Sequence, residues 1–87
     1  MATSKTDISQ WFDKGRTDGE DFMIIVCDTY DWEDYPIYTK TAEFSDTYEH
    51  YNGRSMQKIM EVYNLALDKQ VQLGEISAFH YPPDFQK

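Results

Sequence analysis

The chain has 87 residues, which is enough for one hydrophobic core, so a single domain is expected. Sixteen acidic residues against eight basic ones give a formal charge of −8, which opposes direct binding to a nucleic-acid backbone. The single cysteine, Cys27, excludes an intrachain disulfide, and His50 and His80 lack the spacing of a zinc site.

No metal or other cofactor is therefore expected, and self-association into a homodimer or a higher homo-oligomer is the remaining source of extra stability for so small a domain. The opening ten residues contain no apolar stretch after basic residues. The longest apolar run, from Phe22 to Cys27, is much shorter than the ~20 residues that cross a bilayer. We expect a soluble protein of the reducing cytoplasm with no membrane partner.

The first predicted element is a short amphipathic helix. Residues 1–6 are small and polar and are predicted to be disordered, with Ser4 or Thr6 capping the helix. The helix should end near Gly15 to Gly19, where glycines and charges indicate a C-cap and a loop. Its apolar face carries Ile8, Trp11 and Phe12.

A β-hairpin is predicted next. The run from Phe22 to Cys27 is apolar at every position, as in a central strand that is covered on both faces. The run then becomes amphipathic, and a period of two places Asp28, Tyr30 and Trp32 on one face. Glu33 to Pro36 have the composition of a turn, and Ile37 to Thr41 that of a second, antiparallel strand.

Two helical stretches are predicted after the hairpin. Ser45 or Asp46 can cap the first, which is interrupted at Asn52-Gly53. Ser55 can cap the second, whose apolar stripe comprises Met56, Ile59, Met60, Tyr63 and Leu67. Val62, Leu65 and Ala66 widen this stripe, which indicates coverage on two sides, one of them by a second copy of the chain.

Residues 70–81 fit either a short helix broken at Gly74 or a third strand from Glu75 to Tyr81. Residues 82–87 are predicted to lie across the surface as a tail. The expected architecture is therefore a single α+β domain over residues 7–81, in which an antiparallel hairpin or small sheet packs against two or three helices.

The segment from Cys27 to Tyr35 is the first candidate binding site, because four carboxylates and three aromatic rings follow a buried strand. The rings could stack on a planar group while the carboxylates accept hydrogen bonds, or the segment could be an ordinary solvated hairpin. The start of the second helix, with Arg54 and Lys58, could hold a phosphate or could be a simple capped loop. The predicted ligand-binding residues are Asp28, Tyr30, Asp31, Trp32, Asp34, Tyr35, Arg54 and Lys58.

No catalytic residues are predicted. Cys27 lies in a buried strand and is expected to be a core residue, and neither histidine is close to it in sequence. No catalytic triad and no glycine-rich phosphate loop occurs in the sequence. We therefore expect a binding protein and not an enzyme.

The stretches Met23 to Pro36 and Met56 to Tyr63, together with Trp11-Phe12, resemble a family of short uncharacterised proteins from bacteriophages and bacterial genomes. The resemblance covers most of the chain and implies a small accessory protein encoded by a phage, but no activity or site residue. Analogy with short acidic proteins in that setting implies a stoichiometric inhibitor of host defence in the cytoplasm of the host cell.

Three functions are compatible with these features. The favoured one is a sponge for a nucleotide-derived immune signal, with Tyr30, Trp32 and Tyr35 stacking on it and Arg54, Lys58 or Lys40 meeting its phosphate. The alternative is a protein-binding inhibitor whose acids imitate phosphates in the basic groove of a host defence effector, such as a CRISPR or restriction nuclease. Residues 1–44 support it, since they hold ten acidic and four basic residues. A small nucleotide hydrolase with paired carboxylates is third.

Overall fold

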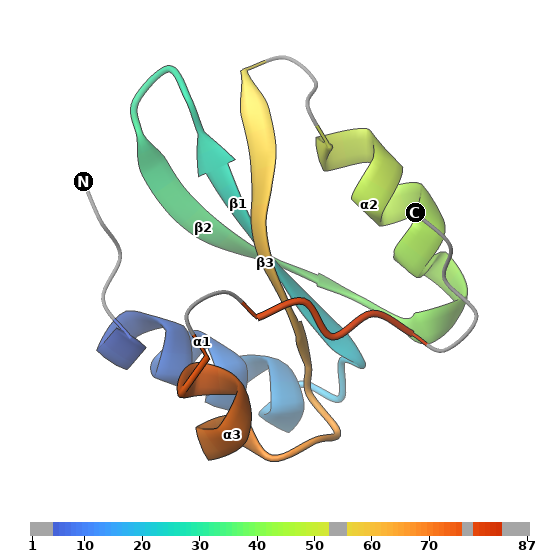
Figure 1. Cartoon of the computed structure of the whole chain (residues 1–87). Coiled ribbons are helices and arrows are strands. Elements are labelled where there is room, and N and C mark those ends of the chain that lie inside the picture. Colours follow the sequence, from blue (N-terminus) through green and yellow to red (C-terminus); the bar gives the residue numbers. More distant parts are fainter. Residues whose placement is uncertain (1–4, 53–55, 76–77, 83–87) are drawn as a thin grey trace.

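The computed structural model describes residues 5–52, 56–75 and 78–82 (Figure 1). The three strands form one antiparallel sheet in the order β2-β1-β3, with helices packed against it. This confirms the predicted α+β class with a small sheet. The elements in chain order are α1 (Lys5–Thr17), β1 (Phe22–Asp28), β2 (Glu33–Thr39), the 3-10 helix η1 (Thr41–Glu43), α2 (Phe44–Tyr51), β3 (Gln57–Asn64) and α3 (Lys69–Leu73).

The ends of the domain differ slightly from the predicted boundaries. Lys5 and Thr6 already belong to α1, although residues 1–6 are predicted to be disordered. Residues 1–4 and 83–87 lie outside the described residues, and Pro82, the first residue of the predicted tail, is buried.

The central strand β1 is confirmed as the core of the domain. Every residue from Phe22 to Cys27 is at most 4% exposed. The strand pairs with β2 along one edge and with β3 along the other, so its backbone hydrogen bonds are made on both sides. The predicted hairpin with β2 is also confirmed, but β2 begins at Glu33, and the turn comprises residues 29–32.

Helices pack against both faces of the sheet. On one face, which we call the α1 face, Met23 and Ile25 pack with Ile8 and Phe12 of α1 and with Tyr63 of β3. The ring of Phe12 meets that of Tyr63 edge to face, with centroids 6.3 Å apart. Helix α3 joins this side through Leu73.

The opposite face, which we call the α2 face, carries the alternate residues of β1. Phe22, Ile24 and Val26 pack with Phe44 of α2 and with Val62 of β3. The two apolar clusters are therefore separated by the sheet itself, as the alternation of side chains along a strand requires.

The predicted helix from Ser55 onwards is wrong: residues Gln57–Asn64 form the strand β3. A β-bulge explains the misleading spacing. Ile25 pairs with Glu61 whereas Val26 pairs with Ile59, so Met60 is an extra residue. The bulge leaves Ile59 and Val62 on the same face although they are three residues apart, and this spacing imitates a helical stripe. Ser55 itself lies outside the described residues.

The C-terminal region contains parts of both predicted alternatives. Lys69–Leu73 form α3, and residues 78–81 then run beside β3. The N–H of Val62 donates to the carbonyl of Ala78 (2.8 Å), and the N–H of His80 donates to the carbonyl of Val62 (2.9 Å). This short parallel bridge covers the edge of β3.

Gly15 allows α1 to approach the sheet closely. A Cβ atom at this position would lie 2.5 Å from the Tyr38 ring and 2.9 Å from a Leu65 methyl group. The hydroxyl of Tyr38 donates to the carbonyl of Trp11 (2.8 Å), which holds the ring against the helix. The ring therefore cannot move away without breaking this hydrogen bond.

Replacing Gly15→Ala should lower the free energy of unfolding by about 1–2 kcal/mol. The clash costs about 2–3 kcal/mol, because three side-chain atoms would lie under 3.0 Å, and it outweighs the gain in helix propensity of about 1 kcal/mol. Gly74→Ala is the matched control, because its Cβ would come no closer than 3.3 Å to another atom. Urea denaturation of both variants checks this, and a Gly15→Ala variant as stable as wild type would contradict the packing.

Candidate functional site

The acidic and aromatic segment forms the turn between β1 and β2. Asp28 pairs with Glu33, and residues 29–32 connect them. The N–H of Tyr30 donates to Oδ1 of Asp28 (2.9 Å), which closes a local Asx turn. The N–H and the hydroxyl of Thr29 both donate to the carbonyl of Met56 (2.7 and 2.8 Å), so the turn is also tied to the start of β3.

We call residues 28–34 together with Met56 the hairpin tip. Its large apolar side chains face solvent: Tyr30 is 74% exposed, Trp32 58% and Met56 62%. Trp32 and Met56 also have positive φ values of 55° and 64°. Residues other than glycine adopt this conformation at a cost of about 1–2 kcal/mol, and such strain clusters at functional sites.

The hairpin tip also carries four carboxylates, those of Asp28, Asp31, Glu33 and Asp34. Lys58 of β3 lies beside the hairpin tip, with its Nζ 5.9 Å from the centroid of the Trp32 ring. The hairpin tip therefore combines exposed rings with a net negative charge.

The sheet separates the predicted site residues into two groups. Asp34 and Lys58 both pair with Cys27 and share the α1 face with it. Burial, followed by the hydrogen bond with Asp34, raises the pKa of the Cys27 thiol, which fits its predicted role as a core residue.

Tyr35 lies on the other side, because it pairs with Val26 of the α2 face. Its hydroxyl accepts a hydrogen bond from Nε2 of Gln57 (2.5 Å), and burial raises its pKa. Tyr35 therefore does not join Tyr30 and Trp32. The predicted common face of Asp28, Tyr30 and Trp32 is also wrong, since β1 ends at Asp28 and the other two lie in the turn. Arg54 lies outside the described residues.

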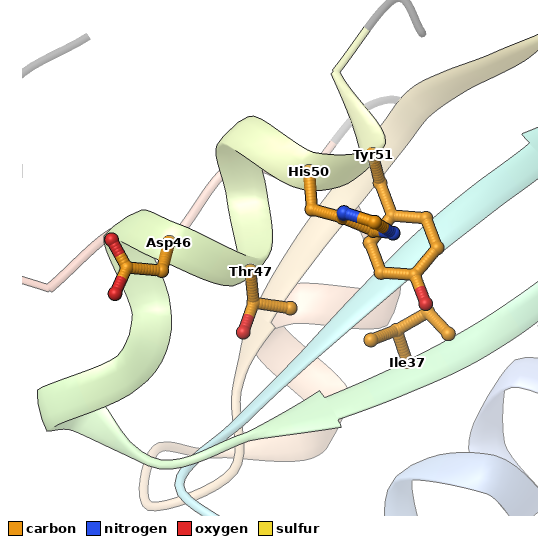
Figure 2. Close-up of a pocket in the computed structure, with 5 residues that line it drawn as sticks. All are labelled: Ile37, Asp46, Thr47, His50 and Tyr51. Carbon is orange, nitrogen blue, oxygen red and sulfur yellow. The ribbon is translucent and has the colours of Figure 1, made fainter. Parts of the chain in front are cut away.

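A hollow that sequence reasoning missed lies between α2 and β2 (Figure 2). Its volume is about 320 Å³, and it opens to solvent. None of the exposed side chains of the hairpin tip lines it. Asp46 and His50 are four residues apart on α2, so the sequence already indicated that they share one face of a helix. The facing wall at Ile37 of β2 depends on tertiary packing and could not be read from the sequence. The lining residues are Ile37, Asp46, Thr47, His50 and Tyr51.

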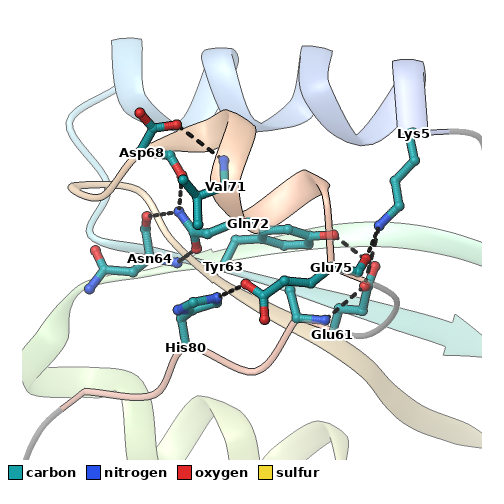
Figure 3. A network of polar contacts seen from close by, with 10 residues as sticks. Lys5, Glu61, Tyr63, Asn64, Asp68, Val71, Gln72, Glu75 and His80 are labelled. Atoms are coloured by element: carbon teal, nitrogen blue, oxygen red, sulfur yellow. Dashed lines mark hydrogen bonds and ion pairs between the residues drawn. The ribbon is translucent and has the colours of Figure 1, made fainter.

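A partly buried polar network lies on the α1 side of β3 (Figure 3). The hydroxyl of Tyr63 donates to Oε1 of Glu61 (2.9 Å), and the N–H of Ala78 donates to Oε2 (3.0 Å). Nζ of Lys5 lies 3.7 Å from the same Oε2. Burial is the main cause that raises the pKa of Tyr63, and the hydrogen bond to Glu61 adds to it.

This network is a structural clamp, because its groups bind one another and the backbone. Glu61 connects α1, β3 and the C-terminal segment, and His80 Nε2 lies 2.5 Å from Oε1 of Glu75. In the described part of the chain, every buried side-chain nitrogen and oxygen has a hydrogen-bond partner. The strongly raised pKa of Tyr63 therefore reflects its burial among hydrogen-bonded groups of the core.

Residues 5–52, 56–75 and 78–82 contain neither a metal-binding cluster nor a membrane-spanning helix. No three His, Cys, Asp or Glu side chains in these ranges gather closely enough to hold a metal ion. No helix in these ranges has the length and apolar character needed to cross a bilayer.

Comparisons with protein-family models, with curated proteins and with solved structures find no significant match to this chain. The geometry of the hairpin tip and of the hollow is therefore the basis for a functional proposal.

Replacing Tyr63→Phe should reduce the loss of stability at alkaline pH. Because the pKa of Tyr63 is raised in the folded protein, its contribution is complete below the ordinary tyrosine value of about 10 and is lost as pH rises above it. The free energy of unfolding should therefore fall less between about pH 8 and pH 11 in this variant than in wild type. At about pH 8 the variant should be roughly 1 kcal/mol less stable, because Glu61 loses a donor.

Urea denaturation at the two pH values measures this difference. Tyr30→Phe is the control, because that ring is exposed and the described structure gives its hydroxyl no buried acceptor. An alkaline loss in Tyr63→Phe equal to that of wild type would contradict the burial of the Tyr63 hydroxyl beside Glu61.

Proposed function

We propose that this chain is a non-catalytic protein-binding module that acts stoichiometrically through the hairpin tip. The proposed partner is a protein whose surface carries Arg or Lys side chains around an apolar pocket. A host defence effector with a basic groove fits this description and the resemblance to phage proteins. The observation that carries the proposal is the pair of exposed rings, Tyr30 and Trp32, on a hydrogen-bonded turn among four carboxylates.

The composition of the hairpin tip supports this proposal. Aromatic anchors dominate the binding energy of protein interfaces, and acids around them steer a basic partner and fix its orientation. The turn is already held by hydrogen bonds to Asp28 and Met56. A contact surface that is ordered before binding loses little conformational entropy in the complex.

The favoured sequence hypothesis, a sponge for a nucleotide signal, gains less support. Lys40 donates to the carbonyl of Gly19 and lies 4.0 Å from Glu20, far along β2 from the turn. Lys58 lies beside Trp32, but the four carboxylates of the hairpin tip would repel a phosphate. The rings of Tyr30 and Trp32 are exposed and line no described cavity. We therefore place the acidic protein-binding inhibitor ahead of the sponge and of the hydrolase.

The double variant Tyr30→Ser/Trp32→Ser should lose its protein partner. Wild type and variant are immobilised and exposed to a bacterial lysate at low salt, and retained proteins are identified by mass spectrometry. Losing a single anchor worth about 2 kcal/mol weakens Kd about 30-fold, so we expect at least that loss for the purified partner. Raising the salt should weaken the wild-type complex as the acids are screened.

Leu67→Ser/Val71→Ser is the matched control, since it removes apolar side chains of similar exposure, 49% and 66%, elsewhere on the surface. This control should bind like wild type, and circular dichroism should show that all variants are folded. Retention of the same partner by the Tyr30→Ser/Trp32→Ser variant would sink the proposal, as would a wild-type chain that retains no protein. Calorimetry with nucleotides distinguishes the sponge from the protein-binding module, because a sponge would release heat on binding a nucleotide without any protein partner.

A further inference from the structure

The hollow between α2 and β2 combines one apolar wall, two rings and one carboxylate. Ile37 of β2 lies beneath Tyr51, and His50 lies against the Tyr51 ring (Figure 2). The two ring centroids are 4.7 Å apart, with planes at 82°, so the rings meet edge to face. Thr47 and Asp46 continue the lining toward the first turn of α2.

The polar side chains of this hollow differ in whether they already have a partner within the protein. The hydroxyl of Thr47 shares a hydrogen bond with that of Thr39 (3.2 Å). Asp46 makes no ion pair with any cation of the described residues, in contrast to Asp13 and Asp18, which pair with Lys69 and Lys14. Figure 2 shows the Asp46 carboxylate at the outer end of the lining, pointing away from Ile37 and Tyr51, so it is open to a cation from solvent.

The charge around the hollow selects the sign of its ligand. Neither η1 nor α2 contains a lysine or arginine, whereas Glu43 and Glu49 flank Asp46 at intervals of three residues. The local potential is therefore negative, which repels phosphates and attracts ammonium and guanidinium groups. A cation there can also lie over the face of an aromatic ring such as Tyr51.

The volume sets the size of the ligand. About 320 Å³ lies at the lower end of the ~300–1,000 Å³ that ligand sites occupy. We propose that the hollow binds a guanidinium or ammonium group on a short apolar stem, with the cation at Asp46 and the stem extending past Thr47 toward Ile37 and Tyr51. This is a second site, independent of the hairpin tip, and such a group belongs either to a free small molecule or to the side chain of an arginine or lysine in another protein.

NMR titration of the whole chain, labelled with ¹⁵N, tests this site. Butylguanidinium and butylammonium are the cationic probes, and butyrate has a similar stem with the opposite charge. We expect saturable shifts of the amides of Ile37 and of residues 46–51 with a Kd of about 1 mM or tighter for at least one cation, and no saturable shifts with butyrate. No saturation with either cation, or equal binding of butyrate, overturns the proposal.

A pair of variants distinguishes direct contact between the cation and Asp46 from general electrostatic attraction by the acidic residues of α2. Asp46→Asn should weaken binding at least about 5-fold, whereas Glu49→Gln removes the same charge from α2 outside the hollow and should change Kd less than about 2-fold. Equal weakening by both variants would overturn the site. The Tyr30→Ser/Trp32→Ser variant should bind butylguanidinium like wild type, so failure of this site and failure of the proposed protein-binding surface are distinguishable.

A second titration, in which acetyl-Gly-Arg-Gly-amide replaces butylguanidinium, shows whether the cation belongs to a protein side chain or to a free small molecule. Equal or tighter binding of this peptide supports the site and indicates an arginine side chain of a protein, because the mouth then admits a peptide backbone. Binding of butylguanidinium alone supports the site and indicates a free small molecule. Saturable shifts of both probes confined to residues outside the hollow would overturn the assignment.

Discussion

The domain depends on one strand that is apolar on both faces. Each of the six residues from Phe22 to Cys27 is almost fully buried, and burying one large aliphatic or aromatic side chain contributes about 1.5–3 kcal/mol. A strand of this kind requires cover on both faces and partners on both edges. Helices α1 and α3 supply one cover, α2 the other, and β2 and β3 the two edges. Glu61, which accepts from the buried Tyr63 and from the N–H of Ala78, then fixes the C-terminal segment beside β3, so this edge is covered as well.

The same strand explains why the hairpin tip protrudes. The apolar run ends at Cys27, and the residues from Asp28 to Asp34 are acidic or amphipathic and mostly exposed, whereas Tyr35 and Ile37 pack against the core again. The turn is nevertheless held by Asp28 and by the carbonyl of Met56, and two of its apolar side chains belong to residues with positive φ. Strain and exposed rings reduce the stability of an isolated domain, and both are explained if the turn has evolved as a contact surface.

The parts of the fold that sequence could predict are those whose patterns are local. The apolar run of β1 and the amphipathic spacing in α1 both depend on neighbouring residues. The turn predicted at Glu33 to Pro36 was misplaced, because these residues pair with β1 as part of β2. Strand β3 could not be recognised, because the bulge at Met60 converts an alternating pattern into a spacing of three. The residues of the hairpin tip were recognisable from their composition, whereas the separation of Tyr35 from Trp32 follows from where the turn begins. The hollow at Asp46 was not predictable, since its wall at Ile37 is brought there only by tertiary packing.

The central claim is that the hairpin tip is a contact surface ordered before it meets a partner. Backbone ¹⁵N relaxation of the free chain tests this most directly, because it reports the order of each amide from residue 28 to residue 34. The hydrogen bonds of Tyr30 and Thr29 predict order parameters for the turn close to those of β1, about 0.85. Values below about 0.6 at residues 29–32, with β1 still rigid, would contradict the claim.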